Sequence, residues 1–304
     1  MGPPNKEMAQ PKPLRIPFRA ESARLPAMRG EFVDLGGKRI YYYAAGSRGA
    51  GEPVILLHGF PTSSRLWHSV VRDFPAGHRL VVVDLPGYGR SDPLDVGGDG
   101  VTSATHAAAI HALFDELSIA KACVVGHGLG GGVAQALAVQ WPDRVSALAL
   151  VSSSGFGAKP ARMARMARAL GPLARHAPPG LLAGLVHGGV RRGFADPDRS
   201  RLTLDTCLHA FTTPAGRTAL AGHLAALDHC DTAQWSARLG QLQMPTAVIW
   251  GQDDPFFPPA HGERLAAAIP GATFDAIPGA AHFVPEDSPD HLRRVLERLL
   301  TRLA

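Results

Sequence analysis

The chain has few of the features that mark secreted, membrane-embedded or metal-binding proteins. Its 304 residues include only three cysteines, Cys123, Cys207 and Cys230, an odd number without the close spacing of a metal site or a disulfide framework. No apolar run approaches the roughly 18 residues that a membrane-spanning helix needs. We therefore expect a cytoplasmic protein with reduced cysteines, no metal site and no membrane partner.

Aromatic residues make up only 7% of the chain and charged residues 19%, against 45% hydrophobic residues. A disordered chain contains far fewer apolar residues, so a folded protein with a large core is expected. The net charge of +5 comes from scattered arginines rather than from a basic block with interleaved aromatic residues, which argues against a nucleic-acid partner. A small-molecule partner is expected, and the chain is expected to be a monomer or homodimer.

The N-terminal residues differ in composition from the rest of the chain. Six prolines lie between Met1 and Pro26, and this stretch has no apolar segment of the kind that a secretory signal contains. Residues 1–28 are therefore predicted to form a flexible arm. The chain has no Walker loop and no metal-ligand spacing of His and Cys, so no cofactor is expected.

Short apolar runs alternate with helical patterns along most of the chain, and such runs are typical of buried parallel strands. The runs lie at Val54–Leu57, Leu80–Val83, Ala122–Val125, Leu148–Val151 and Thr246–Trp250. A hairpin at Glu31–Leu35 and Arg39–Ala44 and a late strand at Thr273–Ile277 complete the set. Helical patterns lie at Ser103–Leu117, Gly131–Trp141, His261–Ala268 and Pro289–Arg302. The alternation predicts an α/β fold, with a mostly parallel central sheet and helices on both faces.

The alternation is interrupted once, after the sixth predicted strand. Residues 155–242 offer only helix-like stretches, so they are predicted to form a helical cap inserted into a core of residues 29–154 and 243–304. A pocket between cap and sheet is expected to be largely apolar. Three cap aromatics, Trp235, Phe194 and Phe211, are predicted to line it.

The run Gly-His-Gly-Leu-Gly at 126–130 follows an apolar strand and precedes a helix. This is the context of a nucleophile elbow, Gly-x-Ser-x-Gly, in which a sharp turn exposes a nucleophile above the sheet. The match is complete except at the middle position, where Gly128 has no side chain. The backbone N–H of Leu129, with that of Phe60 in the earlier loop 58–61, is predicted to form an oxyanion hole.

Two residues late in the chain supply an acid and a base in the order that this arrangement requires. Asp254 follows the predicted strand at Thr246–Trp250, and His282 lies 28 positions later, after the last predicted strand. The carboxylate would orient the imidazole and stabilise its protonated form. Asp254 is preferred to Asp253 from its spacing to the strand. Asp84 and His58 are predicted to be structural.

Together these motifs resemble the α/β-hydrolase superfamily, from Arg29 to the C-terminus. The loop at 58–64 and the Asp254/His282 pair are most similar to the capped branch that includes haloalkane dehalogenases, epoxide hydrolases and small-molecule esterases. Both of the first two families need an aspartate where Gly128 lies. Epoxide hydrolases also use cap tyrosines, which the predicted cap lacks, and dehalogenases place a tryptophan where this chain has Leu129. An ester, lactone or similar apolar carbonyl compound is the expected substrate.

Glycine cannot form a covalent intermediate, so four interpretations of Gly128 remain open. It is an engineered replacement, or a natural residue beside which His282 activates water for direct attack. Alternatively, His282 abstracts a substrate proton in lyase, isomerase, cyclase or cofactor-free oxygenase chemistry, or the protein binds a ligand without turnover. Hydrolysis is the leading prediction. Ser152, Ser153 and Ser154 follow the strand before the cap, and they are expected to be turn or helix-cap residues rather than a displaced nucleophile.

Overall fold

The computed structural model describes residues 30–46, 51–94, 101–158, 161–174, 176–229 and 231–303. The predicted arm at residues 1–28 and Cys230 lie outside these ranges. Within them, eight strands form one sheet in the order β1-β2-β4-β3-β5-β6-β7-β8. The strands are β1 (Glu31–Asp34), β2 (Arg39–Gly46), β3 (Val54–Leu57), β4 (Arg79–Val83), β5 (Ala122–His127), β6 (Val145–Val151), β7 (Thr246–Gly251) and β8 (Thr273–Ile277).

The sheet is mostly parallel. Only the pairs β1–β2 and β2–β4 are antiparallel, and the other neighbouring strands run in the same direction. This topology confirms the predicted α/β fold, including the N-terminal hairpin. The predicted strands differ from the observed ones only by a few residues at their ends.

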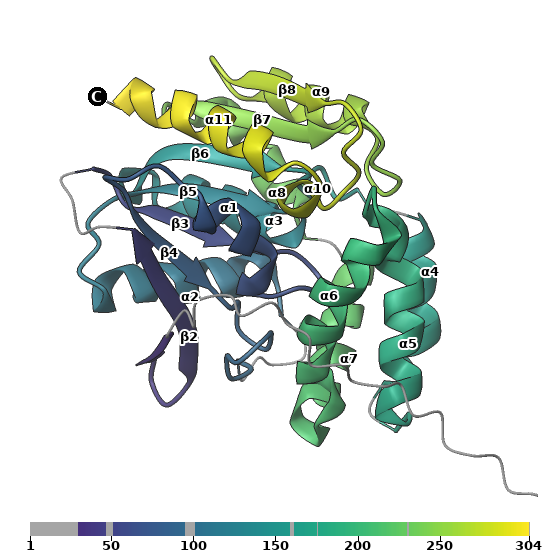
Figure 1. The fold of residues 1–304 in the computed structure, drawn as a ribbon. Helices are drawn as coiled ribbons and strands as arrows, with labels where there is room; N and C mark the ends of the chain where they lie inside the picture. Colours follow the sequence, from purple (N-terminus) through teal and green to yellow (C-terminus); the bar gives the residue numbers. More distant parts are fainter. Residues whose placement is uncertain are drawn as a thin grey trace, which may run out of the picture.

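Helices cover both faces of this sheet. They are α1 (His68–Arg72), α2 (Ser103–Glu116), α3 (Leu129–Gln140), α9 (Pro259–Ala268), α10 (Val284–Asp287) and α11 (Pro289–Leu300). Figure 1 shows α1 and α11 on one face, with α2 and α3 on the other. Every residue of β3, β5 and β6 is buried, which explains their continuous apolar sequences. Each buried Val or Leu side chain contributes about 1.5–3 kcal/mol to folding.

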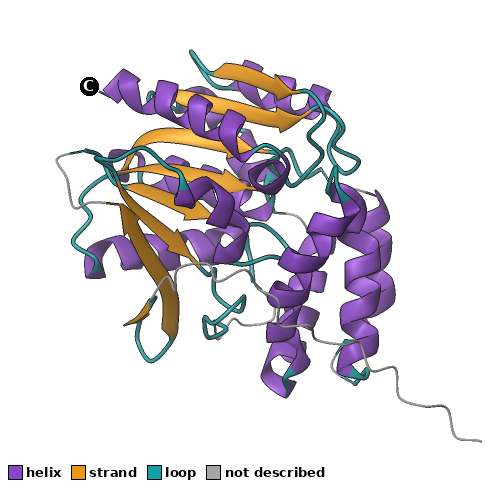
Figure 2. Cartoon of the chain, viewed as in Figure 1, coloured by secondary structure: helices purple, strands orange, loops and turns teal. Residues whose placement is uncertain are grey.

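Between β6 and β7 the described residues form helices and no strand. These helices are α4 (Ala161–Leu170), α5 (Pro179–Val190), α6 (Pro197–Leu208), α7 (Pro214–His229) and α8 (Ala233–Ser236). Figure 2 shows α4 to α7 beyond the arrowheads of the strands, at the carboxyl ends of the parallel part of the sheet. Loops that follow parallel strands meet at this edge, so the helices stand over the place where such folds hold their ligands. In the described part of the chain, no helix is long and apolar enough to cross a membrane.

Candidate active site

The turn between β5 and α3 places Gly128 at the edge of the sheet. Gly128 has φ 54° and ψ −117°, a conformation that side-chain-bearing residues rarely adopt, and it is the N-cap of α3. Strand β5 and helix α3 lie so close together here that a Cβ added to Gly126 would overlap the carbonyl group of Gly130. Helix α3 begins at Leu129, two residues earlier than the sequence pattern predicted, because the turn itself is so tight.

Asp254 and His282 form a hydrogen-bonded pair. Asp254 follows β7, His282 follows β8, and the Nδ1–H of His282 donates to Oδ2 of Asp254 at 2.8 Å. The other carboxylate oxygen of Asp254 accepts from the backbone N–H groups of Phe256 at 2.8 Å and Phe257 at 3.0 Å. The Asp254 side chain is fully buried, whereas Asp253 is exposed. The fixed carboxylate keeps the proton on Nδ1 and leaves Nε2 as the basic nitrogen.

The basic nitrogen of His282 faces Gly128. An ideal Cβ on Gly128 would lie 3.4 Å from Nε2 of His282 and 3.7 Å from Cα of Gly59. Both distances are ordinary van der Waals separations, so a Cβ atom would fit there without displacing either neighbour. The structure therefore brings the predicted base and the predicted nucleophile position together, with open space where a nucleophile would be.

Phe60 and Leu129 lie close to Gly128, in the loop after β3 and at the start of α3. The loop that carries Phe60 packs against the start of α3. The approach is close, since a Cβ added to Gly59 would lie 3.2 Å from the backbone N of Leu129. The first N–H groups of a helix have no acceptor within the helix, so the N–H of Leu129 is available to a ligand. Both residues line the cavity described below.

Two buried histidines hold the surrounding loops. His127 Nε2–H donates to the backbone carbonyl of His282 at 3.0 Å and so ties the β5 turn to the loop after β8. His58 Nδ1–H donates to the carbonyl of Gly59 at 3.0 Å, while its Nε2 accepts from the N–H of Leu85 at 3.0 Å. Burial lowers the pKa of both imidazoles, so both remain neutral donors and acceptors.

Asp84 fixes the loop after β4. Its carboxylate accepts from the backbone N–H groups of Ser64 at 2.7 Å and Arg90 at 2.9 Å, and the hydroxyl of Ser91 donates to its carbonyl at 2.6 Å. These contacts are all with neighbouring loops. They agree with the structural role that the sequence indicated for Asp84.

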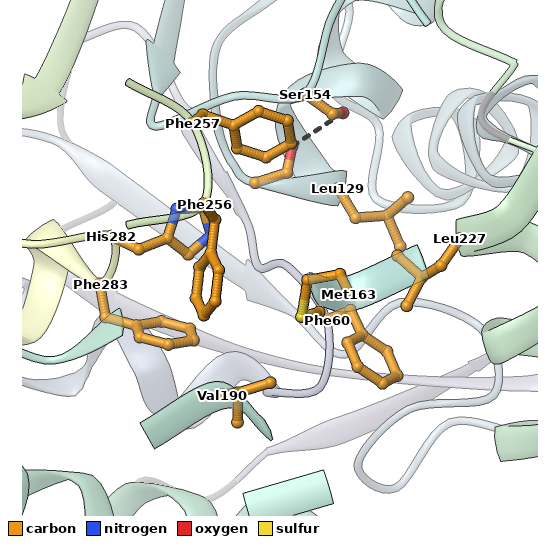
Figure 3. Close-up of a pocket in the computed structure, with 11 residues that line it drawn as sticks. Phe60, Leu129, Ser154, Met163, Val190, Leu227, Phe256, Phe257, His282 and Phe283 are labelled. Atoms are coloured by element: carbon orange, nitrogen blue, oxygen red, sulfur yellow. Dashed lines mark hydrogen bonds between the residues drawn. The ribbon is translucent and has the colours of Figure 1, made fainter. Parts of the chain in front are cut away.

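A cavity that is partly open to solvent lies between these loops and the helices that follow β6. Figure 3 shows its lining side chains pointing toward a common space. The lining residues are Phe60, Gly128, Leu129, Ser154, Met163, Val190, Leu227, Phe256, Phe257, His282 and Phe283. Among them only Ser154 and His282 carry polar side chains, and none carries a guanidinium or ammonium group. The cavity therefore suits an uncharged, apolar compound.

The three aromatic residues that were predicted to line the pocket lie elsewhere, so this prediction was wrong. The indole N–H of Trp235 donates to Oγ of Ser103 at 2.7 Å, which holds the residue against α2. Phe211 packs against Tyr88, with ring centroids 6.1 Å apart. Phe194 stacks on the outside of the lining residue Phe283 at 4.1 Å. Large aromatic side chains at these positions serve the internal packing of the helices.

The residues that take their place are smaller and come from three helices. Met163 of α4, Val190 of α5 and Leu227 of α7 line the cavity. Sequence analysis missed them because each is one apolar residue among many in its helix. A helical period shows which residues share the apolar face of a helix, but not which of them lines the cavity.

The serines after β6 have structural contacts. Ser154 lines the cavity, and its hydroxyl donates to the carbonyl of Gly128 at 3.2 Å. Ser153 donates to the carbonyl of Ser154 at 2.8 Å and accepts from the side-chain amide of Gln135 at 3.1 Å. The Oγ of Ser152 is buried without a partner among the described residues. A carbonyl cannot take a proton from a hydroxyl, so these contacts do not activate Ser154 as a nucleophile.

No group of three or more His, Cys, Asp or Glu side chains in the described ranges is arranged to hold a metal ion. The polar groups of the site are the base His282, its carboxylate partner Asp254, the hydroxyl of Ser154 and backbone N–H groups. This set can move protons and stabilise a developing negative charge.

The chain is similar to several known proteins. The chain is 32% identical over 277 residues to the dihydrolipoyllysine-residue acetyltransferase component of the acetoin cleaving system of Cupriavidus necator, covering 89% of this chain and 68% of that protein. It is 28% identical to the 2-hydroxy-6-oxo-6-phenylhexa-2,4-dienoate hydrolase of Burkholderia cepacia, covering 81% of this chain and 87% of that protein. The solved structure of an N-acyl homoserine lactone degrading enzyme aligns with TM-score 0.68 and 26% identity, covering 88% of this chain and 99% of that one.

The family model also matches over most of the chain. Residues 52–185 and 216–289 match the model of the alpha/beta hydrolase fold. Those ranges include the turn at Gly128, the loop that carries Phe60, and the Asp254–His282 pair. The chain therefore belongs to the alpha/beta hydrolase fold family.

Proposed function

We propose that this protein hydrolyses small or medium uncharged esters or lactones, using water that His282 activates. The observation that carries the proposal is the position of Nε2 of His282, 3.4 Å from where a Cβ on Gly128 would lie. Asp254 holds the imidazole from its other side at 2.8 Å. An oriented base facing an open space is the arrangement that direct attack by water needs.

In the proposed reaction, a water molecule beside Gly128 donates a proton to Nε2 of His282 as its oxygen attacks the substrate carbonyl. The backbone N–H groups of Phe60 and Leu129 act as the oxyanion hole for the negative charge that develops. Asp254 stabilises the imidazolium ion. As the tetrahedral intermediate collapses, His282 returns its proton to the leaving alkoxide, and the free enzyme is regenerated without a covalent intermediate.

The helices between β6 and β7 act as a cap in this proposal, corresponding to the predicted segment 155–242. Met163, Val190 and Leu227 would contact the acyl chain from the cap side, while Phe60 and Leu129 contact it from the core. The apolar lining supports a preference for uncharged acyl groups. The similarity to a lactone-degrading enzyme supports lactones as one substrate class.

The rate expected of such an enzyme is modest. When a triad loses its nucleophile, binding and the oxyanion hole still accelerate the reaction by about 10³–10⁴-fold over water. An intact Asp–His pair adds general base catalysis of an attacking water, which is typically worth about 10²–10⁴-fold. A protein that only binds a ligand would show neither of these two rate enhancements.

Proton abstraction from the substrate is the competing function, because the same open space exposes Nε2 of His282 to a substrate C–H group. In that case the N–H groups of Phe60 and Leu129 would stabilise an enolate or alkoxide. The two reactions differ in whether an oxygen atom from water enters the product. Hydrolysis places one oxygen atom from solvent in the acid product, whereas lyase or isomerase chemistry places none.

The test is turnover of a panel of aryl esters and lactones by the chain and by His282→Ala, with product analysis in ¹⁸O-labelled water. We expect hydrolysis that His282→Ala abolishes, with ¹⁸O in the acid and no acylated protein by intact mass spectrometry. Equal turnover by the chain and by His282→Ala would contradict the proposal. Turnover that depends on His282 but leaves no ¹⁸O in the product would favour proton abstraction instead.

A further inference from the structure

The space beside Gly128 is bordered by the basic nitrogen of one residue and by a backbone carbon of another. We call it the Gly128 niche, bounded by Gly128, Gly59 and His282. The nearest heavy atoms to an ideal Cβ on Gly128 are Nε2 of His282 at 3.4 Å, Cα of Gly59 at 3.7 Å and Cε1 of His282 at 3.9 Å. Since Gly128 also lines the cavity, the niche opens into the space proposed for the acyl substrate.

We propose that the Gly128 niche is a binding site for a second small substrate, an uncharged nucleophile of about the size of methanol or hydroxylamine. The chain would then transfer acyl groups directly from an ester to that acceptor. This inference rests on the proposed function, because it uses the same base and the same acyl substrate. It differs from that function in its product, which is a new ester or a hydroxamate rather than an acid.

The chemistry of the niche walls favours such an acceptor. One wall is the basic nitrogen of His282, which takes a proton from an O–H or N–H group. The other wall is the Cα of Gly59, a carbon atom that a methyl group contacts without losing a hydrogen bond. A carboxylate would find no cationic side chain among the described lining residues, so acceptors are expected to be uncharged.

The size of the niche follows from the fold. The turn between β5 and α3 presents one short side chain in members of this family that have a nucleophile, and a serine side chain there has two heavy atoms. A diffusible molecule must lie farther from the Cα of Gly128 than a covalently bonded Cβ does. It therefore also occupies the part of the cavity next to Gly128. Methanol and hydroxylamine fit this limit, whereas propanol would compete with the acyl substrate for space.

The transfer step balances without any further reactant. The acceptor oxygen or nitrogen forms a bond to the carbonyl carbon while its proton moves to Nε2 of His282. The N–H groups of Phe60 and Leu129 hold the resulting oxyanion. The bond between the carbonyl carbon and the leaving oxygen then breaks, and His282 returns the proton to that oxygen. The products are the acylated acceptor and the alcohol of the original ester.

This single displacement has a kinetic signature. When an enzyme forms an acyl-enzyme in a slow first step, an added acceptor changes the products but not the rate at which the leaving group is released. When the acceptor itself attacks, the release rate rises with acceptor concentration. Gly128 cannot form an acyl-enzyme, so the second behaviour is expected for this chain.

The experiment uses 4-nitrophenyl butyrate with increasing methanol, hydroxylamine or 1-propanol. It measures nitrophenol release together with the yields of butyric acid, butyrate ester and hydroxamate. We expect hydroxylamine to raise the part of nitrophenol release that depends on His282 by roughly threefold or more, because it is a stronger nucleophile than water, with hydroxamate accounting for the increase. Methanol should give methyl butyrate, and propanol should give much less ester than methanol at equal concentration.

Two variants separate the niche from the rest of the site. Gly128→Ala places a methyl group in the niche and should reduce acyl transfer by about tenfold or more, because the acceptor loses its position against the base. Gly128→Ser should change the kinetics, so that acceptors alter the products without raising nitrophenol release. Circular dichroism checks that both variants fold, and the acceptor series on the unchanged chain needs no variant.

The outcomes are distinguishable. Hydrolysis that depends on His282, with acid as the only product and a release rate that no acceptor changes, would overturn the niche and leave the proposed function standing. Absence of any release that depends on His282, with water or with acceptors, would overturn both. Transfer to hydroxylamine and methanol without hydrolysis would support the niche and contradict the hydrolytic function.

Discussion

Nε2 of His282 lies 3.4 Å from the point that a Cβ on Gly128 would occupy, and no neighbouring atom obstructs that point. A base in this position can take a proton from the group beside it, whether that group is a side chain at position 128 or a diffusible molecule. The elements that align the two residues lie far apart in the sequence, because Gly128 follows β5 and His282 follows β8.

Gly128→Ser is expected to convert the site to covalent catalysis. The serine hydroxyl would lie within hydrogen-bond reach of His282, which would activate it as a nucleophile. We expect a burst of nitrophenol and an acylated protein by intact mass spectrometry. Gly128→Ala, which has the same backbone strain but no hydroxyl, is the matched control and should show neither. A Gly128→Ser protein that folds and never becomes acylated would contradict the proposed roles of His282 and Gly128.

Both substitutions at Gly128 are expected to reduce stability. The residue has φ 54°, so any side chain there is strained, at a cost of about 1–3 kcal/mol in the free energy of unfolding. The control is Gly184→Ala in α5, where a Cβ would contact nothing within 4 Å and the backbone is helical. That change should stabilise the protein by roughly 0.5–1 kcal/mol. Urea denaturation measures the free energy of unfolding of each variant. Equal values for Gly128→Ala and Gly184→Ala would count against strain at Gly128.

Asp254→Asn is expected to reduce the turnover that depends on His282 by about 10³–10⁴-fold. The amide would present an N–H group or a neutral oxygen to Nδ1, so the imidazole would lose its preferred tautomer and the stabilisation of its protonated form. Asp253→Asn changes an exposed neighbour and should leave kcat/KM within about twofold. Steady-state kinetics on one aryl ester suffices. Similar losses in the two variants would show that Asp254 has no special role.

Val190→Phe is expected to restrict the acyl group that the cavity accepts. Val190 lines the cavity from α5, and a phenyl ring would occupy space that a longer acyl chain needs. The ratio of kcat/KM for hexanoyl over acetyl esters should fall by roughly tenfold or more. Leu185→Phe on the same helix is the control, because Leu185 is 47% exposed and does not line the cavity. An unchanged ratio in Val190→Phe would place the acyl chain elsewhere.

The stability of the protein is expected to fall as the pH decreases from about 6.5 to about 4. His223 of α7 is buried, stacks on Tyr88 at 3.8 Å and donates from Nε2 to the carbonyl of Gly87 at 3.1 Å. Burial lowers its pKa from 6.5 to about 4. Above pH 6.5 the imidazole is neutral in both states. Below that pH the unfolded chain binds a proton that the folded protein resists, at a cost of order 3 kcal/mol by pH 4.

His106 strengthens the same dependence, because its buried imidazole also has a pKa well below 6.5. Urea denaturation at a series of pH values measures the effect for the chain and for His223→Asn, which retains a donor for Gly87. The variant should lose part of the slope between pH 6.5 and pH 4. An identical slope in both proteins would show that His223 does not resist protonation in the folded state.

Sequence alone determined the fold class, because parallel strands buried on both faces need continuous apolar runs and covering helices need a helical period. Local motifs also indicated the site: a glycine-rich turn after a strand, an aspartate and a histidine after two later strands. These residues could be found because each sits at the carboxyl end of a strand, where the topology of a parallel sheet brings loops together. The absence of a side chain at Gly128 was equally plain in the sequence.

Tertiary structure alone decided what surrounds that turn. The contact between His127 and the carbonyl of His282 joins residues 155 positions apart, and no local pattern predicts it. The rotation of each helix against the core decides which of its residues line the cavity. The lining residues are Met163, Val190 and Leu227, rather than Trp235, Phe194 and Phe211. Rotation is set by the packing of whole surfaces, so a helical sequence identifies an apolar face but does not say which of its residues meets the substrate.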